Sequence, residues 1–241
     1  MALIRLDKFL TDITSFSRRE IKGVLKAGRV KVNGVPAKES DMKIDADSDV
    51  VEFDSKRMIY EQFRYYVLNK PAGVISATKD KLSDTVVDLL EGVDTKDLFP
   101  VGRLDKDSVG LLLITNDGKL SHELLSPSKH VEKEYFVKLD RPLAEDEKER
   151  IESGIDIGDD KPCLPAKVEI LDDESALIKI SEGRFHQVKR MFSAVGINVT
   201  YLKRLSMGEL RLPEDLAEGE FIKLETEQIE RMFGGRNAKG K

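Results

Sequence analysis

The residues that could do chemistry lie between two glycines. Gly102-Arg103-Leu104-Asp105 places a cation and a carboxylate two residues apart, so both side chains would face the same way on an extended backbone. Gly102 and Gly110 allow close approach of a ligand or of another chain segment. A carboxylate at such a place can act as a nucleophile or as a base. By itself, however, an Arg-x-Asp pair is more typical of a salt-bridged turn, so catalysis would need partners elsewhere in the chain.

Other catalytic patterns are missing from the sequence. There is no Ser/His/Asp order, no phosphate-binding Gly-Lys-Ser/Thr loop and no Gly-x-Gly-x-x-Gly at the start of a helix. The single cysteine, Cys163, excludes an intrachain disulfide and favours a reducing cytoplasm. Together with His122, His130 and His186 it has no metal-ligand spacing. We therefore expect no Cys/His metal site and no nucleotide or dinucleotide cofactor, while carboxylate sites for a hard cation stay open.

Composition and charge narrow the class of protein. The 241 residues are 40% hydrophobic and 35% charged, which is typical of a globular chain with one large domain or two smaller ones. No apolar run has membrane-spanning length, and charges interrupt Met1–Leu10, so we expect neither a membrane segment nor a signal peptide. The net charge is −5, yet Met1–Lys31 carries eight Lys/Arg against three Asp/Glu, and Gly183–Arg211 carries six against one. Two basic patches on an acidic protein indicate a bounded face for a polyanion.

Residues 1–56 have the pattern of a small α+β unit. Apolar spacing from Leu3 to Ile13 predicts a helix, and Ser17-Arg18-Arg19-Glu20 predicts the capping box of a second helix that ends at Gly28. Asn33-Gly34 predicts a tight hairpin, and a strand follows at Val50–Phe53. Cations decorate the second helix and the strand after it: Arg18, Arg19, Lys22, Lys26, Arg29 and Lys31. Their charge alone would suit a solvated face as well as a binding face.

Residues 57–62 are expected to be a linker, residues 63–233 a second domain, and residues 234–241 a disordered tail. Alternation and apolar runs predict strands at Tyr65–Asn69, Leu98–Val101, Val109–Thr115, Glu132–Leu139, Ala166–Leu171, Ala176–Ile180, Asn198–Leu205 and Phe221–Leu224. Helices are predicted from Ser83/Asp84 to Leu90 and at Lys119–Leu125, Leu143–Ile151, Phe185–Val195 and Glu227–Met232. Because the helices do not alternate regularly with the strands, the pattern indicates a mixed, largely antiparallel sheet.

The first unit resembles a known RNA-binding domain. Leu6-Asp7-Lys8-Phe9-Leu10, the capping box, and Gly28-Arg29-Val30-Lys31-Val32-Asn33-Gly34 are together similar to the S4 domain. The resemblance implies that the second helix and the following turn lie on structured RNA. Recognition by shape and phosphate contacts suits double-stranded RNA, whose deep groove hides the base edges.

Three blocks of the second unit follow one another along the chain: Gly102–Asp105 with Gly110–Gly118, then Glu132-Lys133-Glu134-Tyr135, then Ser181–Phe192. In this order they are similar to the catalytic domain of the RsuA family of pseudouridine synthases. An S4 domain in front of the synthase domain is also the architecture of that family. The resemblance implies that a uridine in RNA is isomerised to pseudouridine, without a cosubstrate or metal.

The resemblance also implies roles for individual residues. Asp105 falls on the catalytic aspartate of the family, and Tyr135 on a tyrosine that stacks on the target base and serves in proton transfer. Lys189 falls where many of these enzymes have an arginine, and a cation there would keep Asp105 ionised. Lysine forfeits the bidentate pairing of arginine, and Arg190 is a neighbouring alternative. Outside this context, a strand tyrosine is more often a core residue and a helix lysine more often solvated.

Four further residues are expected to contact RNA. A uridine in folded RNA must be unstacked before its glycosidic bond is reachable. In the wider superfamily, the residue near the position of Arg103 can occupy the gap that the flipped base leaves. Arg184, His186 and Arg190 lie in the second basic patch. Phe185 and His186 are candidate pocket or stacking residues.

We therefore predict a two-domain α+β ribosomal RNA pseudouridine synthase with helices flanking its catalytic sheet. The blocks Glu182–Phe192 and Ile151–Leu164 look more like the small-subunit branch, so the expected substrate is uridine 516 of 16S rRNA, modified by a cytoplasmic monomer. One alternative is the same chemistry on 23S rRNA. The other is a non-catalytic RNA-binding assembly factor, which would have no use for a carboxylate beside phosphates.

Overall fold

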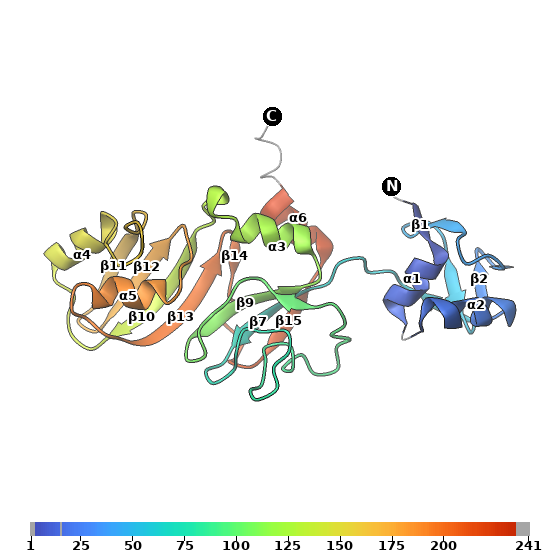
Figure 1. The fold of residues 1–241 in the computed structure, drawn as a ribbon, viewed down its shortest axis with the longest axis horizontal. Helices are drawn as coiled ribbons and strands as arrows, with labels where there is room; N and C mark the ends of the chain where they lie inside the picture. The colour runs from blue at the N-terminus through green and yellow to red at the C-terminus, as the bar shows by residue number, and fades with distance from the viewer. Residues whose placement is uncertain (1–2, 15, 235–241) are drawn as a thin grey trace. The chain divides into compact units, whose positions relative to one another are not determined.

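The computed structural model describes residues 3–14 and 16–234, in two compact units that divide after Gln62 (Figure 1). The predicted disordered tail lies outside the described residues from residue 235 onward. No helix within the described ranges is long and apolar enough to cross a membrane.

The first unit packs two helices against short strands. Its elements are β1 (Leu3–Arg5), α1 (Leu6–Ile13), α2 (Arg18–Lys26), β2 (Val30–Val32), β3 (Val35–Pro36), β4 (Lys43–Asp45), β5 (Val51–Phe53) and β6 (Lys56–Met58). The strands form a sheet in the order β3-β2-β5-β6 and a separate pair, β1-β4. One apolar cluster from both helices and the strands fills the interior.

Local signals explain much of this unit. The predicted capping box at Ser17 and Glu20 is present, and Gly28 follows α2 in the left-handed conformation that a helix end favours. Asn33 and Gly34 have φ of 51° and 78°, as the hairpin between β2 and β3 requires.

Two expectations for the first unit need correction. The segment from Leu3 is not helical throughout, because Leu3–Arg5 pairs with β4 and α1 begins only at Leu6. The segment expected as a linker contains the end of β6, which pairs with β5. Tyr60 in this segment also stacks on Phe9 and donates to Asp12, so it belongs to the first unit.

The second unit contains most of the chain. Its elements are β7 (Tyr65–Lys70), β8 (Phe99–Pro100), β9 (Val109–Thr115), α3 (Gly118–Leu125), the 3-10 helix η1 (Pro127–Lys129), β10 (Lys133–Leu139), α4 (Glu145–Glu152), β11 (Lys167–Asp172), β12 (Ser175–Ile180), α5 (Gln187–Ser193), β13 (Val199–Met207), β14 (Leu210–Arg211), β15 (Phe221–Leu224) and α6 (Thr226–Phe233). The strands form one sheet in the order β11-β12-β10-β13-β9-β7-β15, with β14 and β8 at its sides. The predicted mixed, largely antiparallel sheet is confirmed, because β13 and β9 form its one parallel pair in the described part of the chain.

The sheet has two halves that differ in how they are covered. Strands β7 and β9 are buried along their whole length, with α3 and α6 on one face and loops carrying Val74 and Val86 on the other (Figure 1). Strands β10 to β13 bury one face, chiefly against α5, and alternate with more exposed residues on the other. The halves meet at the β9–β13 pair, whose register covers only Val109–Lys203 and Gly110–Arg204.

One predicted helix is wrong. The segment from Ser83 to Leu90 forms successive turns instead, with a bridge between Ile75 and Thr85. The Asp88 carboxylate accepts hydrogen bonds from the Thr85 amide and hydroxyl at 2.9 and 2.8 Å, an arrangement that also starts helices, so it does not by itself explain the turns. The apolar residues of this segment cover β7 and β9 without helical structure.

Candidate active site

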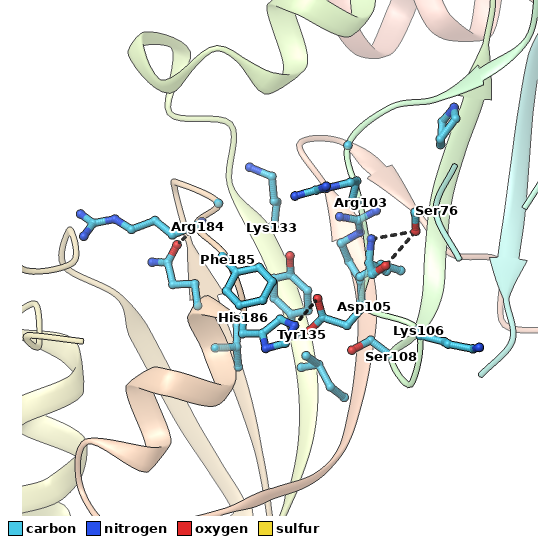
Figure 2. Close-up of a pocket in the computed structure, with 18 of the residues that line it drawn as sticks. Ser76, Arg103, Asp105, Lys106, Ser108, Lys133, Tyr135, Arg184, Phe185 and His186 are labelled. Atoms are coloured by element: carbon cyan, nitrogen blue, oxygen red, sulfur yellow. Dashed lines mark hydrogen bonds and ion pairs between the residues drawn. The ribbon is translucent and has the colours of Figure 1, made fainter. Parts of the chain in front are cut away.

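A pocket of about 860 Å³ lies across the junction of the two halves, and Asp105 lines it (Figure 2). Asp105 follows β8 and precedes β9, in a turn closed by a hydrogen bond from the Ser108 amide to the Asp105 carbonyl. Its side chain is 26% exposed, so a ligand in the pocket can reach the carboxylate. We call residues 104–108 the aspartate loop.

The buried side chain of Lys70 supports the aspartate loop through hydrogen bonds to its backbone carbonyls. This side chain is fully buried, and its ammonium donates to the carbonyls of Asp105, Ser108 and Pro71 at 3.0, 2.8 and 3.0 Å. Burial lowers the pKa of Lys70 to about 8, against the attraction of Asp107 and Asp105. Two of these three carbonyls belong to the aspartate loop, and the Lys106 carbonyl accepts from the same ammonium at 3.4 Å, so Lys70 fixes the backbone that follows the carboxylate.

A second support comes from Ser76. Its hydroxyl donates to the Leu104 carbonyl at 2.8 Å and accepts from the Leu104 amide at 3.0 Å (Figure 2). The backbone immediately before Asp105 is therefore clamped through both of its polar groups.

The floor of the pocket is built by β10 and β13. Tyr135 pairs in register with Arg204, so the two side chains stand next to each other on the same face of the sheet. Arg204 is 2% exposed; its Nε donates to the Leu111 carbonyl at 2.8 Å, while Nη2 has no hydrogen-bond acceptor. Burial, and then Arg204, lower the pKa of Lys133 to about 8. Two buried cations thus surround the tyrosine.

The side of the pocket opposite the aspartate loop is the start of α5. His186 precedes this helix in the left-handed conformation, with φ 50° and ψ 32°. Its Nε2 lies 3.3 Å from Asp105 Oδ1, and its ring stacks on Phe185 (Figure 2). The predicted helix from Phe185 therefore starts later, at Gln187.

Lys189 reaches the aspartate loop from α5, but its closest partner is a different carboxylate. Its ammonium lies 2.7 Å from both oxygens of Asp107 and 3.8 Å from Asp105 Oδ2. The hydrogen bond from Lys189 holds the pKa of Asp107 below its usual range. The expected Lys189–Asp105 pair is therefore a long contact beside a shorter one that sequence analysis did not foresee.

The other expected RNA contacts of this unit differ in how available they are. Arg103 is exposed at the pocket. The Arg184 guanidinium instead contacts Glu182 at 3.1 Å and the Pro162 carbonyl at 2.7 Å. Arg190 contacts Asp159 at 2.6 Å. These internal contacts occupy the donors of Arg184 and Arg190, so the geometry disfavours the RNA contacts expected of them.

In the first unit, the expected RNA-contacting cations are all exposed: Arg18, Arg19, Lys22, Lys26, Arg29 and Lys31. Arg29 is already paired, since it forms two hydrogen bonds with Asp54 and lies over the Phe53 ring. The five others keep the solvent-facing positions on α2 and β2 that a binding surface needs.

Sequence analysis missed two residues that shape the site, Lys70 and Arg204. Both are long cationic side chains that the sequence would place on the surface by composition. Lys70 comes at the end of a strand and Arg204 in the middle of another, and only the fold reveals that both are buried. Lys133 was quoted as part of a motif without a role, and it too is buried in the pocket.

Comparisons with known proteins agree with both units. Residues 64–194 match the family model described as RNA pseudouridylate synthase, and residues 4–51 match the S4 domain. An uncharacterized RNA pseudouridine synthase of Bacillus subtilis is 45% identical, with 94% of this chain and 97% of the relative covered. Proteins of Yersinia pestis and Escherichia coli named ribosomal small subunit pseudouridine synthase A are 39% and 38% identical, each over 94% of this chain and 97% and 98% of their own. A crystal structure of a pseudouridylate synthase is similar with a TM-score of 0.67 and 37% identity, over 95% of this chain and 99% of the other.

Proposed function

This chain belongs to the RNA pseudouridylate synthase family, and we propose that it converts uridine 516 of 16S rRNA to pseudouridine with Asp105 as the catalytic carboxylate. The relatives named for the small ribosomal subunit support the choice of RNA. The S4 domain supports a structured RNA as the substrate. Action as a monomer in the cytoplasm stays a prediction.

The observation that carries the proposal is the charge of the pocket lining. Asp105 is the only carboxylate among the described residues that line the pocket, and the exposed cations Arg103 and Lys106 line it as well. Cations attract an RNA strand, whereas a carboxylate repels its phosphates. A reachable carboxylate at this place therefore favours a chemical role over a binding role.

The reaction needs three events at one nucleotide. The bond from N1 to C1′ breaks, the uracil turns, and C5 bonds to C1′ while the C5 proton is lost and N1 gains one. Asp105 can serve as a nucleophile towards the sugar or base, or as a base towards the sugar. Tyr135 lies in the same pocket, where its ring can stack on the uracil and its phenol can take part in the proton transfer. Lys189 supplies positive charge beside Asp105.

RNA would be held at two places. In the synthase unit, the uridine must leave its stack to reach Asp105, and Arg103, which is exposed at the pocket, would occupy the space it leaves. In the S4 unit, Arg18, Arg19, Lys22, Lys26 and Lys31 would contact phosphates. Arg29 and His186 are retained as weaker candidates because each already has a carboxylate partner.

The test is to map pseudouridine in 16S and 23S rRNA transcripts after incubation with the purified protein. Wild type is expected to modify one 16S position and no 23S position. Asp105→Asn should abolish the product while RNA affinity stays within about threefold, since the side chain keeps its size and only loses its charge. Asp173→Asn, in the exposed turn between β11 and β12, is the matched control.

Three outcomes would contradict parts of the proposal. Modification of 23S rRNA alone would select the other substrate. RNA binding without any product in wild type would favour a non-catalytic assembly factor. Product formation by Asp105→Asn would remove Asp105 from the catalytic role.

A further inference from the structure

Phe185 is an exposed aromatic residue at the edge of the pocket. It is 68% exposed and is the one aromatic side chain among the exposed large apolar residues of the described chain. A single exposed apolar residue needs no explanation by itself. Three further features of this residue, its ring contact, its backbone and its neighbours, indicate a binding role.

The first feature is the ring contact. The rings of Phe185 and His186 are nearly parallel, with centroids 3.8 Å apart and planes at 18°. In Figure 2 the Phe185 ring lies against His186, and His186 points to Asp105. One face of the Phe185 ring is therefore covered, and its large exposed fraction leaves the rest of the ring open to solvent.

The second feature is the backbone that presents these rings. His186 has a φ of 50°, in a region that residues other than glycine seldom adopt. With this backbone the His186 ring lies against Asp105, while Phe185 stays exposed at the edge of the pocket. The arrangement is fixed by its surroundings, because the Arg190 guanidinium donates to the Phe185 carbonyl at 3.1 Å and the Arg190 amide to the His186 carbonyl at 2.9 Å. A preformed flat surface loses little conformational entropy when it binds a ligand.

The third feature is the neighbourhood. Arg103 and Lys106 are exposed and line the same pocket, so phosphates on either side of a bound nucleotide would find cations nearby. Single-stranded RNA is commonly held by this combination, with the bases on aromatic rings and the backbone on Lys or Arg.

We propose that Phe185 and His186, here called the aromatic ledge, bind the unpaired base next to the target uridine. This neighbouring base stacks on the open face of Phe185. When the uridine turns out of its strand to reach Asp105, its neighbour loses a stacking partner. The ledge replaces that partner directly beside the pocket. This binding mode rests on the proposed function, because it requires an RNA strand with one uridine inside the pocket.

The experiment uses the full-length protein and a 16S rRNA hairpin that contains the modified uridine. 2-Aminopurine, a base whose fluorescence falls on stacking, replaces the base before or after that uridine in two separate RNAs. Binding should quench one of the two RNAs, and Phe185→Ala should remove the quenching. In steady-state assays, Phe185→Ala should raise KM roughly 5- to 150-fold, the range for loss of one base–aromatic stack, and change kcat less than twofold.

Two variants and one control separate stacking from general packing. Phe185→Trp keeps an aromatic face and should retain both the quenching and the KM, whereas Phe185→Leu keeps apolar bulk and should behave like Phe185→Ala. Leu171→Ala removes an exposed apolar side chain of β11 outside the pocket and should change neither quantity.

The outcomes also distinguish the ledge from the proposed function. If the wild type modifies the hairpin but Phe185→Ala alters neither quenching nor KM, the ledge is wrong and the function stands. A fall in kcat without quenching of either neighbour would mean that Phe185 contacts the uracil itself, which also overturns the ledge. If the wild type fails to modify any rRNA, the proposed function and the ledge fail together.

Discussion

Substitution of Lys70 by methionine tests whether a buried ammonium sets the position of the Asp105 carboxylate. Methionine has a similar length and no charge, so it fills the space and removes the donor. The side chain is fully buried beneath the aspartate loop and cannot touch RNA. The expected defect is therefore in kcat, with KM changed less than twofold.

The expected change in the free energy of unfolding is the difference between two opposing contributions. A pKa of about 8 in place of 10.5 means that the fold disfavours the ammonium by about 3 kcal/mol, which the substitution relieves. The substitution also leaves the carbonyls of Asp105, Ser108 and Pro71 without their donor, at about 1–3 kcal/mol each. The net loss of unfolding free energy is therefore roughly 3 kcal/mol. If the loop moves to regain donors from water and Asp105 shifts by about 1 Å, turnover falls on the order of 100-fold.

The assays are urea unfolding and single-turnover pseudouridine formation, with Lys119→Met on exposed α3 as the control. Because the folded-state pKa of Lys70 is below its unfolded value, the unfolded state binds more protons between pH 8 and 10.5. Wild-type stability relative to Lys70→Met should therefore rise across that window. A variant that keeps kcat within threefold while losing stability would refute the idea that Lys70 positions Asp105.

Two further predictions concern the junction of the sheet halves and the aspartate loop. Gly110→Ala should lower the free energy of unfolding in urea by on the order of 3 kcal/mol or more, because an added Cβ would lie 2.3 and 2.8 Å from the Arg204 backbone oxygen and nitrogen and Gly110 has a φ of 101°. Gly118→Ala is the control and should be nearly neutral, because it has open space and no positive φ. Equal effects of the two substitutions would contradict the close approach of β9 and β13. Lys189→Gln should raise the pKa of Asp107 towards its ordinary value, because the Lys189 hydrogen bond is the largest cause that lowers it. An NMR pH titration measures this pKa, and an unchanged value would show that the Lys189–Asp107 pair does not persist in solution.

The elements with local signals were predictable from the sequence. The capping box at Ser17 needs only residues in one helix turn, and Asn33-Gly34 needs only its own backbone preference. The helix predicted up to Leu90 failed although the apolar spacing was real, because the same apolar residues reach the sheet from successive turns. Hydrophobic periodicity reports which residues are buried, and here burial was achieved without a helix.

Prediction of the site was limited in a different way. The family resemblance named Asp105, Tyr135 and Lys189, and the fold places the first two in one pocket with Lys189 3.8 Å from the aspartate. The family resemblance could not show that the Lys189 ammonium contacts two carboxylates, Asp107 at 2.7 Å and Asp105 at 3.8 Å. The sequence did not reveal that Arg190 contacts Asp159, because the two residues are distant in sequence and a charge pattern does not show which cations have a carboxylate partner.

The junction of the two sheet halves has a consequence for how the protein matures. Asp105 precedes β9 and Tyr135 lies on β10, yet the strand between β9 and β10 is β13, which is made much later. A nascent chain that ends after β12 already contains both residues but lacks the strand that joins them. Such late insertion of a central strand is a non-local step that slows folding. The pocket would thus be completed only after β13 has left the ribosome, and the chain would gain the ability to modify RNA only from then on.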